Sequence, residues 1–283
     1  MSTTPEPHAR VTGSGGCPVH VRGPAATADN KAQHIVTVLY GVVSYVLFLA
    51  VFLYLVGFVT DVAVPRSIDR AGEAPLGRAV VIDIGLLTLF ALQHTVMARP
   101  GFKRWWTRFV PAPIERSTYM LLAGAALVLM FWQWRAIDTV VWHVESVPAP
   151  AIVYALAGVG WLTVLAATFM IDHFDLFGIR QVLDAWRSKP RDEAGFREVL
   201  LYRVVRHPLL LGFLIAFWAT PTMTAGHLLF AVAMTVYIVI AVRFEERDLV
   251  DALGEPYRRY QDRVPKLMPR LCLRRRKLNS HWT

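Results

Sequence analysis

Long apolar runs separated by short polar segments dominate this chain and predict membrane-spanning helices. Residues 35–59 contain no Asp, Glu, Lys or Arg. At about 1.5 Å per residue, such a helix reaches roughly 37 Å, which is enough to cross a hydrocarbon core of about 30 Å with some tilt. Residues 79–97 carry a single charge, Asp83, and residues 119–134 and 152–171 carry none. The pattern therefore predicts four helical spans before residue 172.

A hairpin of two further spans follows. Residues 209–242 lack Lys, Arg, Asp and Glu, and their one cluster of helix-breaking residues lies near the middle, at 220–226. The first leg is short, so the fifth span is the least regular of the six. A chain that turns at 220–226 returns to the membrane face it left. The polar motifs at 202–208 and 243–249 should therefore meet on one face.

Basic residues are unevenly distributed between the loops, and this asymmetry predicts the orientation. The tail 1–34 and the segments 98–118, 172–207 and 243–283 hold 26 of the 30 Lys and Arg residues. Because short cytoplasmic loops are enriched in Lys and Arg, these four segments are predicted to be cytoplasmic. Both termini then lie in the cytoplasm, as six spans require. The predicted fold class is an all-α integral membrane protein with about six transmembrane segments.

Composition supports this interpretation. The chain of 283 residues is 55% hydrophobic and only 18% charged, with a mean hydropathy of +0.40, which is too apolar for an ordinary soluble domain. The net charge of +9 is explained by topology and by attraction to anionic lipid rather than by nucleic-acid binding. The tails 1–34, predicted to be disordered, and 271–283, which is basic, flank the spans.

Two other residue types add smaller expectations. Cys17 and Cys272 both fall on the predicted cytoplasmic side and have no zinc-ligand spacing, so no metal site or disulfide is predicted. Trp132 and Trp134 close the third span, where tryptophan is typical of the membrane interface.

Polar groups break the apolar pattern at four predicted helix ends. His94 ends the second span, residues 172–181 follow the fourth, and the motifs at 202–208 and 243–249 flank the hairpin. Ionisable groups at a membrane boundary indicate a functional site, so we expect a polar pocket open to the cytoplasm.

Each polar group also has a structural alternative. His94 can be a hydrogen-bonded histidine at a helix end, and the aspartates of 172–181 can cap a turn. The Arg-His-Pro run at 206–208 can be a basic anchor whose proline opens a helix. The expected return of Glu245 and Glu246 to this run favours function.

The C-terminal third resembles a superfamily of integral-membrane methyltransferases, which includes isoprenylcysteine carboxyl methyltransferases and phospholipid methyltransferases. The matching motifs are Arg206-His207-Pro208, Gly212, Glu245-Glu246, Leu253-Gly254-Glu255-Pro256-Tyr257-Arg258-Arg259-Tyr260 and Val264-Pro265. Two positions depart from the usual pattern, since Leu210 and Leu253 stand where Tyr and Phe are usual.

Upstream motifs resemble the NnrU-like branch of that superfamily and, within it, bacterial methanethiol S-methyltransferases. The matching segments are 93–100, 115–119, 132–135 and 172–181. The resemblance implies an NnrU-like transmembrane half at 35–134, a methyltransferase core at 152–270 and a multi-pass protein of the bacterial inner membrane. It also implies a small thiol acceptor, with the bilayer as surroundings and no obligatory protein partner.

The resemblance implies S-adenosylmethionine as the methyl donor. The residues it assigns to the cofactor are Gln181, Tyr202, Arg203, Arg206, His207, Pro208, Gly212, Glu245, Glu246, Tyr257 and Tyr260. The glutamates suit the ammonium group or the ribose hydroxyls, and Arg206 or Arg203 suits the carboxylate. Gly212 would let the adenine or the sulfonium approach closely, and Tyr257 and Tyr260 would stack on the cofactor or close over it.

Methyl transfer to a thiol needs the thiolate, because the neutral thiol is a weak nucleophile. His94, His173 or Asp175 can take the proton, and His173 oriented by Asp175 is the favoured base. Arg180 can lower the pKa of the thiol.

Three other functions stay open from the sequence. The first is methylation of a prenylated or phospholipid acceptor. The second is a non-catalytic NnrU-type membrane protein. The third is a haem binder that uses His94, His173 and His207.

Overall fold

The computed structural model describes residues 28–187 and 198–269. The predicted tails fall largely outside this part of the chain, as do Cys17 and Cys272. Residues 28–34, which were predicted to belong to the disordered tail, instead form the first turns of helix α1 (Ala28–Thr60).

Five helices are long and apolar enough to cross a membrane, so the architecture is that of a mostly helical membrane protein. They are α1, α2 (Leu76–Ala98), α4 (Glu115–Gln133), α5 (Ala149–Ile171) and α9 (Ala225–Leu253). These helices match the predicted first, second, third, fourth and sixth spans. Their outward faces stay apolar, as the exposed side chains of Leu53, Val81 and Leu162 illustrate. Such faces suit lipid.

The predicted fifth span is a shorter helix, α8 (Pro208–Trp218), of 11 residues. At about 16 Å it is too short to cross a core of about 30 Å. The chain continues in extended form to β2 (Thr222–Thr224), which pairs antiparallel with β1 (Val140–His143). The all-α prediction is therefore wrong at these two strands. The breakers at 220–226 end the helix early, and the loop after α4 supplies the hydrogen-bonding partner strand.

Helices α5 and α8 pack closely because two glycines face each other. A Cβ atom on Gly160 would lie 2.7 Å from the backbone nitrogen of Ala216, and one on Gly212 would lie 2.7 Å from the carbonyl oxygen of Gly160. The absence of both side chains lets the two backbones touch. Gly212 was predicted to make room for a cofactor, but the space it leaves is taken by α5.

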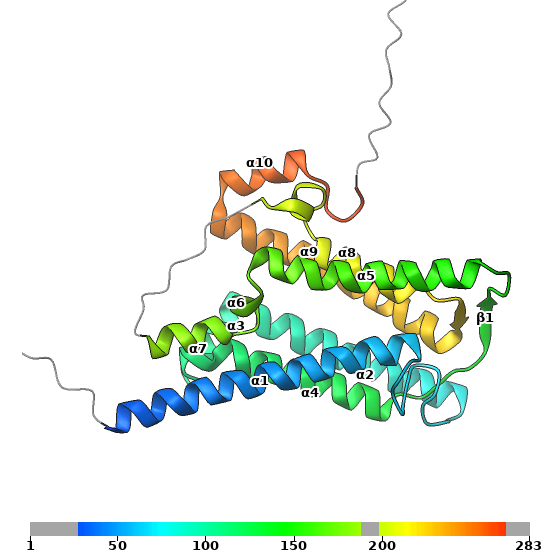
Figure 1. The fold of residues 1–283 in the computed structure, drawn as a ribbon, viewed down its shortest axis with the longest axis horizontal. Helices are drawn as coiled ribbons and strands as arrows, with labels where there is room; N and C mark the ends of the chain where they lie inside the picture. Colours follow the sequence, from blue (N-terminus) through cyan, green and yellow to red (C-terminus); the bar gives the residue numbers. More distant parts are fainter. Residues whose placement is uncertain (1–27, 188–197, 270–283) are drawn as a thin grey trace, which may run out of the picture.

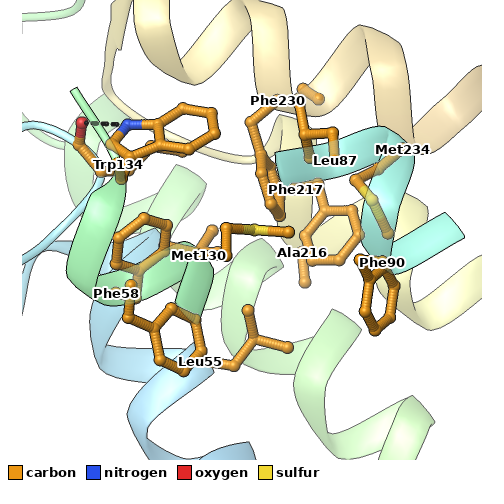
Figure 2. Packing of buried hydrophobic residues seen from close by; sticks show 14 of the residues in the cluster. Leu55, Phe58, Leu87, Phe90, Met130, Trp134, Ala216, Phe217, Phe230 and Met234 are labelled. Carbon is orange, nitrogen blue, oxygen red and sulfur yellow. Dashed lines mark hydrogen bonds between the residues drawn. The ribbon is translucent and has the colours of Figure 1, made fainter. Parts of the chain in front are cut away.

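The helices form two layers (Figure 1), with α1, α2 and α4 in one and α5, α8 and α9 in the other. The main core lies between the layers, where Phe58 and Met130 face Phe217 and Phe230 (Figure 2). Trp134 belongs to this core, since it is fully buried and its Nε1 donates to the carbonyl of Ile68 at 3.1 Å. Its predicted interfacial position is therefore wrong.

The short elements gather at the two ends of the bundle. At one end lie α3 (Pro100–Trp106), α6 (His173–Leu176), α7 (Ile179–Trp186) and α10 (Glu255–Arg263), and at the other lies the β1–β2 pair (Figure 1). Two 3₁₀ turns complete the described chain, η1 (Ala112–Ile114) and η2 (Leu200–Arg203). The end that carries α10 is where the predicted polar motifs meet, and we call it the polar end.

Candidate active site

The Arg-His-Pro motif and the glutamate pair meet at the polar end, as the hairpin predicted. Nε of Arg206 donates to Oε1 of Glu246 at 2.8 Å, and Nη2 lies 2.7 Å from the same oxygen. Nε2 of His207 lies 3.3 Å from that oxygen, and Nζ of Lys266 lies 2.8 Å from Oε2. We call these four residues the ionic cluster. Arg206, His207 and Glu246 are buried, so each charge depends on its partner.

Backbone contacts hold the cluster in place. The N–H groups of Arg206 and His207 donate to the carbonyls of Pro265 and Lys266 at 2.9 and 3.1 Å. Nη1 of Arg206 donates to the carbonyls of Gln261 and Val264 at 2.7 and 2.6 Å. A guanidinium has five N–H donors, and four of them are engaged here. Arg206 stays a predicted cofactor ligand, yet the contacts favour a role in joining Glu246 to the segment after α10.

Glu245 differs from its neighbour in exposure. Its side chain is 52% exposed, and Oε2 lies 3.6 Å from Nδ1 of His207. Burial raises the pKa of Tyr202, and the negative charge of Glu245 adds to that rise. Glu245 therefore presents an accessible carboxylate at the edge of the ionic cluster.

Tyr257 and Tyr260 lie beneath the surface, where they pack with Val264 in a small core of their own. The hydroxyl of Tyr260 donates to the carbonyl of Tyr202 at 2.6 Å. Burial raises the pKa of Tyr260 to about 12. Tyr260 therefore ties α10 to η2, and Tyr257 packs beside it in the same small core. Their predicted contact with a cofactor remains a prediction.

His173, the favoured base, has both ring nitrogens engaged. Nδ1 lies 2.8 Å from Oγ1 of Thr168, and Nε2 lies 2.8 Å from the hydroxyl of Tyr45. Since Thr168 donates its own proton to the carbonyl of Leu165 at 2.7 Å, its oxygen accepts from Nδ1–H of His173. Phe169 stacks on the ring at 4.1 Å. Burial lowers the pKa of His173, while the charge of Asp172 acts in the opposite direction.

The acids around His173 have basic partners of their own. Nη1 of Arg116 donates to Oδ2 of Asp175 at 2.8 Å, and Arg180 binds Asp172. Asp172 also caps α6 by accepting the N–H of Asp175 at 3.0 Å. His173 takes its orientation from Tyr45 and Thr168, which the sequence did not single out.

Gln181, a predicted cofactor residue, is buried on α7. Among the described residues, its Oε1 has no hydrogen-bond partner, and neither does Oγ of Ser117. Gly178, in the left-handed region at φ 83°, brings the backbone before α7 close to Ser117. This pair of unsatisfied oxygens belongs to the junction of α7 with the start of α4.

His94 is the other candidate base, and its surroundings are aromatic. Its ring lies 5.3 Å from that of Phe90, 5.2 Å from that of Tyr119 and 6.4 Å from that of Tyr237. In the part of the chain that the structure describes, its buried Nδ1 has no hydrogen-bond partner. We call His94, Phe90, Tyr119 and Tyr237 the aromatic cluster. Its members come from helices α2, α4 and α9.

The aromatic cluster lies next to the polar end. Nη1 of Arg99, five residues after His94, binds Oδ2 of Asp248 at 2.9 Å, and the guanidinium lies 5.2 Å from the ring of Phe244. Tyr237 precedes Glu245 by eight residues, or about 12 Å along α9. The cluster therefore sits deeper along the helices than Glu245.

Comparison with known proteins places the chain in a family. The family model described as "NnrU protein" matches residues 84–270. The methanethiol S-methyltransferase of Mycobacterium tuberculosis is 58% identical over 237 residues, which cover 84% of this chain and 97% of that protein. The chain belongs to the NnrU family.

Two further relatives were compared with the chain. Methanethiol S-methyltransferase 2 of Bradyrhizobium diazoefficiens is 54% identical, with 84% of this chain and 92% of that protein covered. Human nurim is more distant, at 30% identity over 64% of this chain and 70% of that protein. No solved structure matches. The NnrU match contains the ionic cluster, His94 and His173, whereas Tyr45 lies before it.

Tyr119 and Tyr237 were not among the predicted site residues, although Tyr119 ends the matching segment 115–119. Each lies inside an apolar helix, where a tyrosine is as typical of packing as of function. Only the fold identifies them, because it packs both rings against His94, whose Nδ1 has no partner within the described residues.

Proposed function

We propose that this protein transfers a methyl group from S-adenosylmethionine to methanethiol and so forms dimethyl sulfide. Relatives that carry the name methanethiol S-methyltransferase, at 58% and 54% identity over most of the chain, support this acceptor. The thiolate sulfur forms the new bond to the methyl carbon, the old bond from that carbon to the sulfonium sulfur breaks, and the thiol proton passes to a base.

The polar end fits a donor that carries an ammonium group, a carboxylate and ribose hydroxyls. Glu245 is accessible, so it is the carboxylate we assign to the ammonium group or the hydroxyls. Arg203 is exposed, and within the described residues only its Nε is hydrogen-bonded, to the carbonyl of Glu198 at 3.1 Å. Its terminal nitrogens suit the carboxylate of the donor. Glu246, bound by Arg206 and Lys266, positions this edge.

The single observation that carries the acceptor site is Nδ1 of His94, which has no partner within the described residues and lies among the rings of the aromatic cluster. The rings of Phe90, Tyr119 and Tyr237 are apolar neighbours that suit a small thiol, and an S–H group can donate to this nitrogen. We assign His94 to accept the thiol proton. His173, whose two nitrogens already have partners, remains the competing base.

An assay with purified full-length chain tests this function. Methyl-labelled S-adenosylmethionine is offered with methanethiol, a prenylated cysteine or phosphatidylethanolamine, and dimethyl sulfide is measured in the headspace. Label in dimethyl sulfide supports the proposal, whereas label only in a lipid product assigns the larger acceptor. Donor binding without transfer to any acceptor would indicate a non-catalytic NnrU-type protein, and a Soret band would indicate haem.

For the topology, we propose six passes with both termini in the cytoplasm of a bacterial inner membrane. Five helices are long enough to cross, and the α8–β2 leg would supply the sixth crossing. The sequence segments predicted to be cytoplasmic, 1–34, 98–118, 172–207 and 243–283, hold 26 of the 30 basic residues. Single cysteines at exposed Asp251 and Glu145 test this in spheroplasts. An impermeant maleimide should label the second and spare the first.

A further inference from the structure

Two arginines converge at the end of the bundle opposite the ionic cluster. Arg66 lies in the loop between α1 and α2, and Arg135 follows α4 directly. Nη1 of Arg135 and Nη2 of Arg66 lie 2.6 and 3.4 Å from the point that a Cβ atom on Gly72 would occupy. The two guanidinium groups therefore share the small space beside Gly72.

The backbone around this pair is firmly held. The N–H of Ile68 donates to the carbonyl of Phe58 at 2.9 Å, and its own carbonyl accepts from Nε1 of Trp134. Gly72 forms a bridge with Arg135, and the N–H of Arg135 donates to Oδ1 of Asp83 at 2.9 Å. Ile68, Trp134 and Asp83 are fully buried, so the backbone segments that carry the two arginines are held in place by buried residues.

Among the described residues, no acid forms an ion pair with either guanidinium, and Nη2 of Arg135 donates instead to Oε1 of Gln133 at 3.2 Å. Asp61 binds Arg70, and Asp69 accepts from Thr224 at 2.6 Å. Asp83 contacts the backbone of Arg135, and its buried Oδ2 has no hydrogen-bond partner within the described residues. In the same part of the chain, Nε and Nη2 of Arg66 are covered by protein atoms and also lack a partner.

Donors that are removed from water without an acceptor are costly, and two like charges side by side add repulsion. An anion between the arginines would relieve both. Both residues are half-buried, so an anion that contacts Nε and Nη2 of Arg66 has to displace the protein atoms that cover them. Guanidinium forks match tetrahedral oxyanions in shape and charge.

We propose that Arg66 and Arg135 form a binding site for a phosphate group at the membrane boundary, separate from the methyl-transfer site. The phosphate can belong to an anionic phospholipid headgroup or be free in solution, and both sources present the same oxyanion. The site would tie the loop after α1 to the end of α4.

Thermal unfolding of the full chain in a neutral detergent tests this proposal, with inorganic phosphate or phosphatidylglycerol added and phosphatidylcholine and NaCl of equal ionic strength as references. The variants are Arg66→Gln and Arg135→Gln. Arg78→Gln, an exposed arginine on the same side, is the matched control. We expect a rise in Tm for the wild type and Arg78→Gln that both site variants lose.

The two ligands distinguish the source. A rise with inorganic phosphate alone assigns a free anion, and a rise confined to phosphatidylglycerol assigns the lipid headgroup. Equal responses in all four proteins would overturn the proposal, as would no response in any. Native mass spectrometry of the wild type gives a readout that does not depend on variant folding. Absence of both retained phosphatidylglycerol and bound phosphate would also overturn the proposal.

Discussion

Nε and Nη2 of Arg206 bind Oε1 of Glu246 at 2.8 and 2.7 Å, and Nζ of Lys266 binds Oε2 of Glu246 at 2.8 Å. Both carboxylate oxygens are thus engaged inside the protein. The adjacent Glu245 lies half exposed at the same edge. Glu246 is therefore held inside the protein, whereas Glu245 is the neighbouring acid that we propose meets a ligand.

Replacement of Glu246 tests the holding role. In Glu246→Gln, the buried guanidinium of Arg206 loses its counter-charge, which should cost about 3–5 kcal/mol of unfolding free energy. Thermal unfolding in detergent measures the loss. Lys266→Gln, which removes a half-exposed partner, should cost no more than about 1 kcal/mol. Wild-type stability in Glu246→Gln would contradict the holding role.

Replacement of Glu245 tests the ligand role. Glu245→Gln should keep the thermal stability of the wild type and weaken S-adenosylmethionine binding about tenfold or more, because one charge-assisted contact of about 1.5–3 kcal/mol is lost. Isothermal titration calorimetry gives the affinity. Asp251→Asn, an exposed change on the same helix, should leave it unaltered. An unchanged Kd for Glu245→Gln would remove this residue from the donor site.

The two candidate bases can be separated by their variants. His94→Gln should lower kcat about 10²–10⁴-fold with donor affinity retained, since the thiol loses its proton acceptor. His173→Gln should affect kcat much less, because both nitrogens of His173 serve Tyr45 and Thr168. Headspace dimethyl sulfide production over a range of pH provides the rates. The reverse order of the two effects would assign the base to His173.

The lowered pKa of His173 makes a prediction about pH and stability. An unfolded histidine titrates near pH 6.5, and burial holds the folded pKa below that value, so the unfolded chain binds the proton more readily. The contribution of His173 to the free energy of unfolding is therefore complete above about pH 6.5. It is lost as the pH falls through the pKa of the folded state. Between about pH 8 and 5, the Tm of His173→Gln should therefore fall less steeply with decreasing pH than the Tm of the wild type. Parallel curves would show that this histidine does not contribute.

The contact between α5 and α8 can be tested with two glycines of one helix. Gly160→Ala would place a Cβ atom 2.7 Å from the backbone nitrogen of Ala216, which should cost about 1–3 kcal/mol as the helices separate. Gly158 has no atom within 4 Å of that position. Gly158→Ala should therefore raise stability by up to about 1 kcal/mol through helix propensity. Chemical unfolding in detergent compares the two, and equal effects would argue against a close helix contact.

The return of the hairpin could be predicted because a charge-free run with one central break has few ways to cross a membrane. The meeting of Arg206 with Glu246 follows from that topology alone. The strand β2 could not be predicted in the same way, because its partner β1 lies about 80 residues earlier and sequence periodicity does not report such pairings.

Within the site, the residue types were easier to predict than their partners. An arginine beside a glutamate pair suits a polar ligand. Most N–H groups of Arg206, however, donate hydrogen bonds to other groups of the protein. His173 was paired with Asp175 by proximity in sequence, whereas the fold brings Tyr45 from α1 to the ring. Trp134 was predicted to lie at the membrane interface because tryptophan is typical of the ends of membrane spans. In the fold, the loop at Ile68 covers it.

The hydrogen bonds from Arg206 to backbone carbonyls of residues 261–265 have a consequence for the synthesis of the protein. Those residues are synthesised after α8 and α9, so Nη1 of Arg206 lacks its two backbone acceptors, the carbonyls of Gln261 and Val264, until the chain has grown past them. The ionic cluster is therefore completed last during synthesis, when Lys266 has been added. A chain that ends before residue 261 should hold the charged side chains of the hairpin without the segment that fixes them.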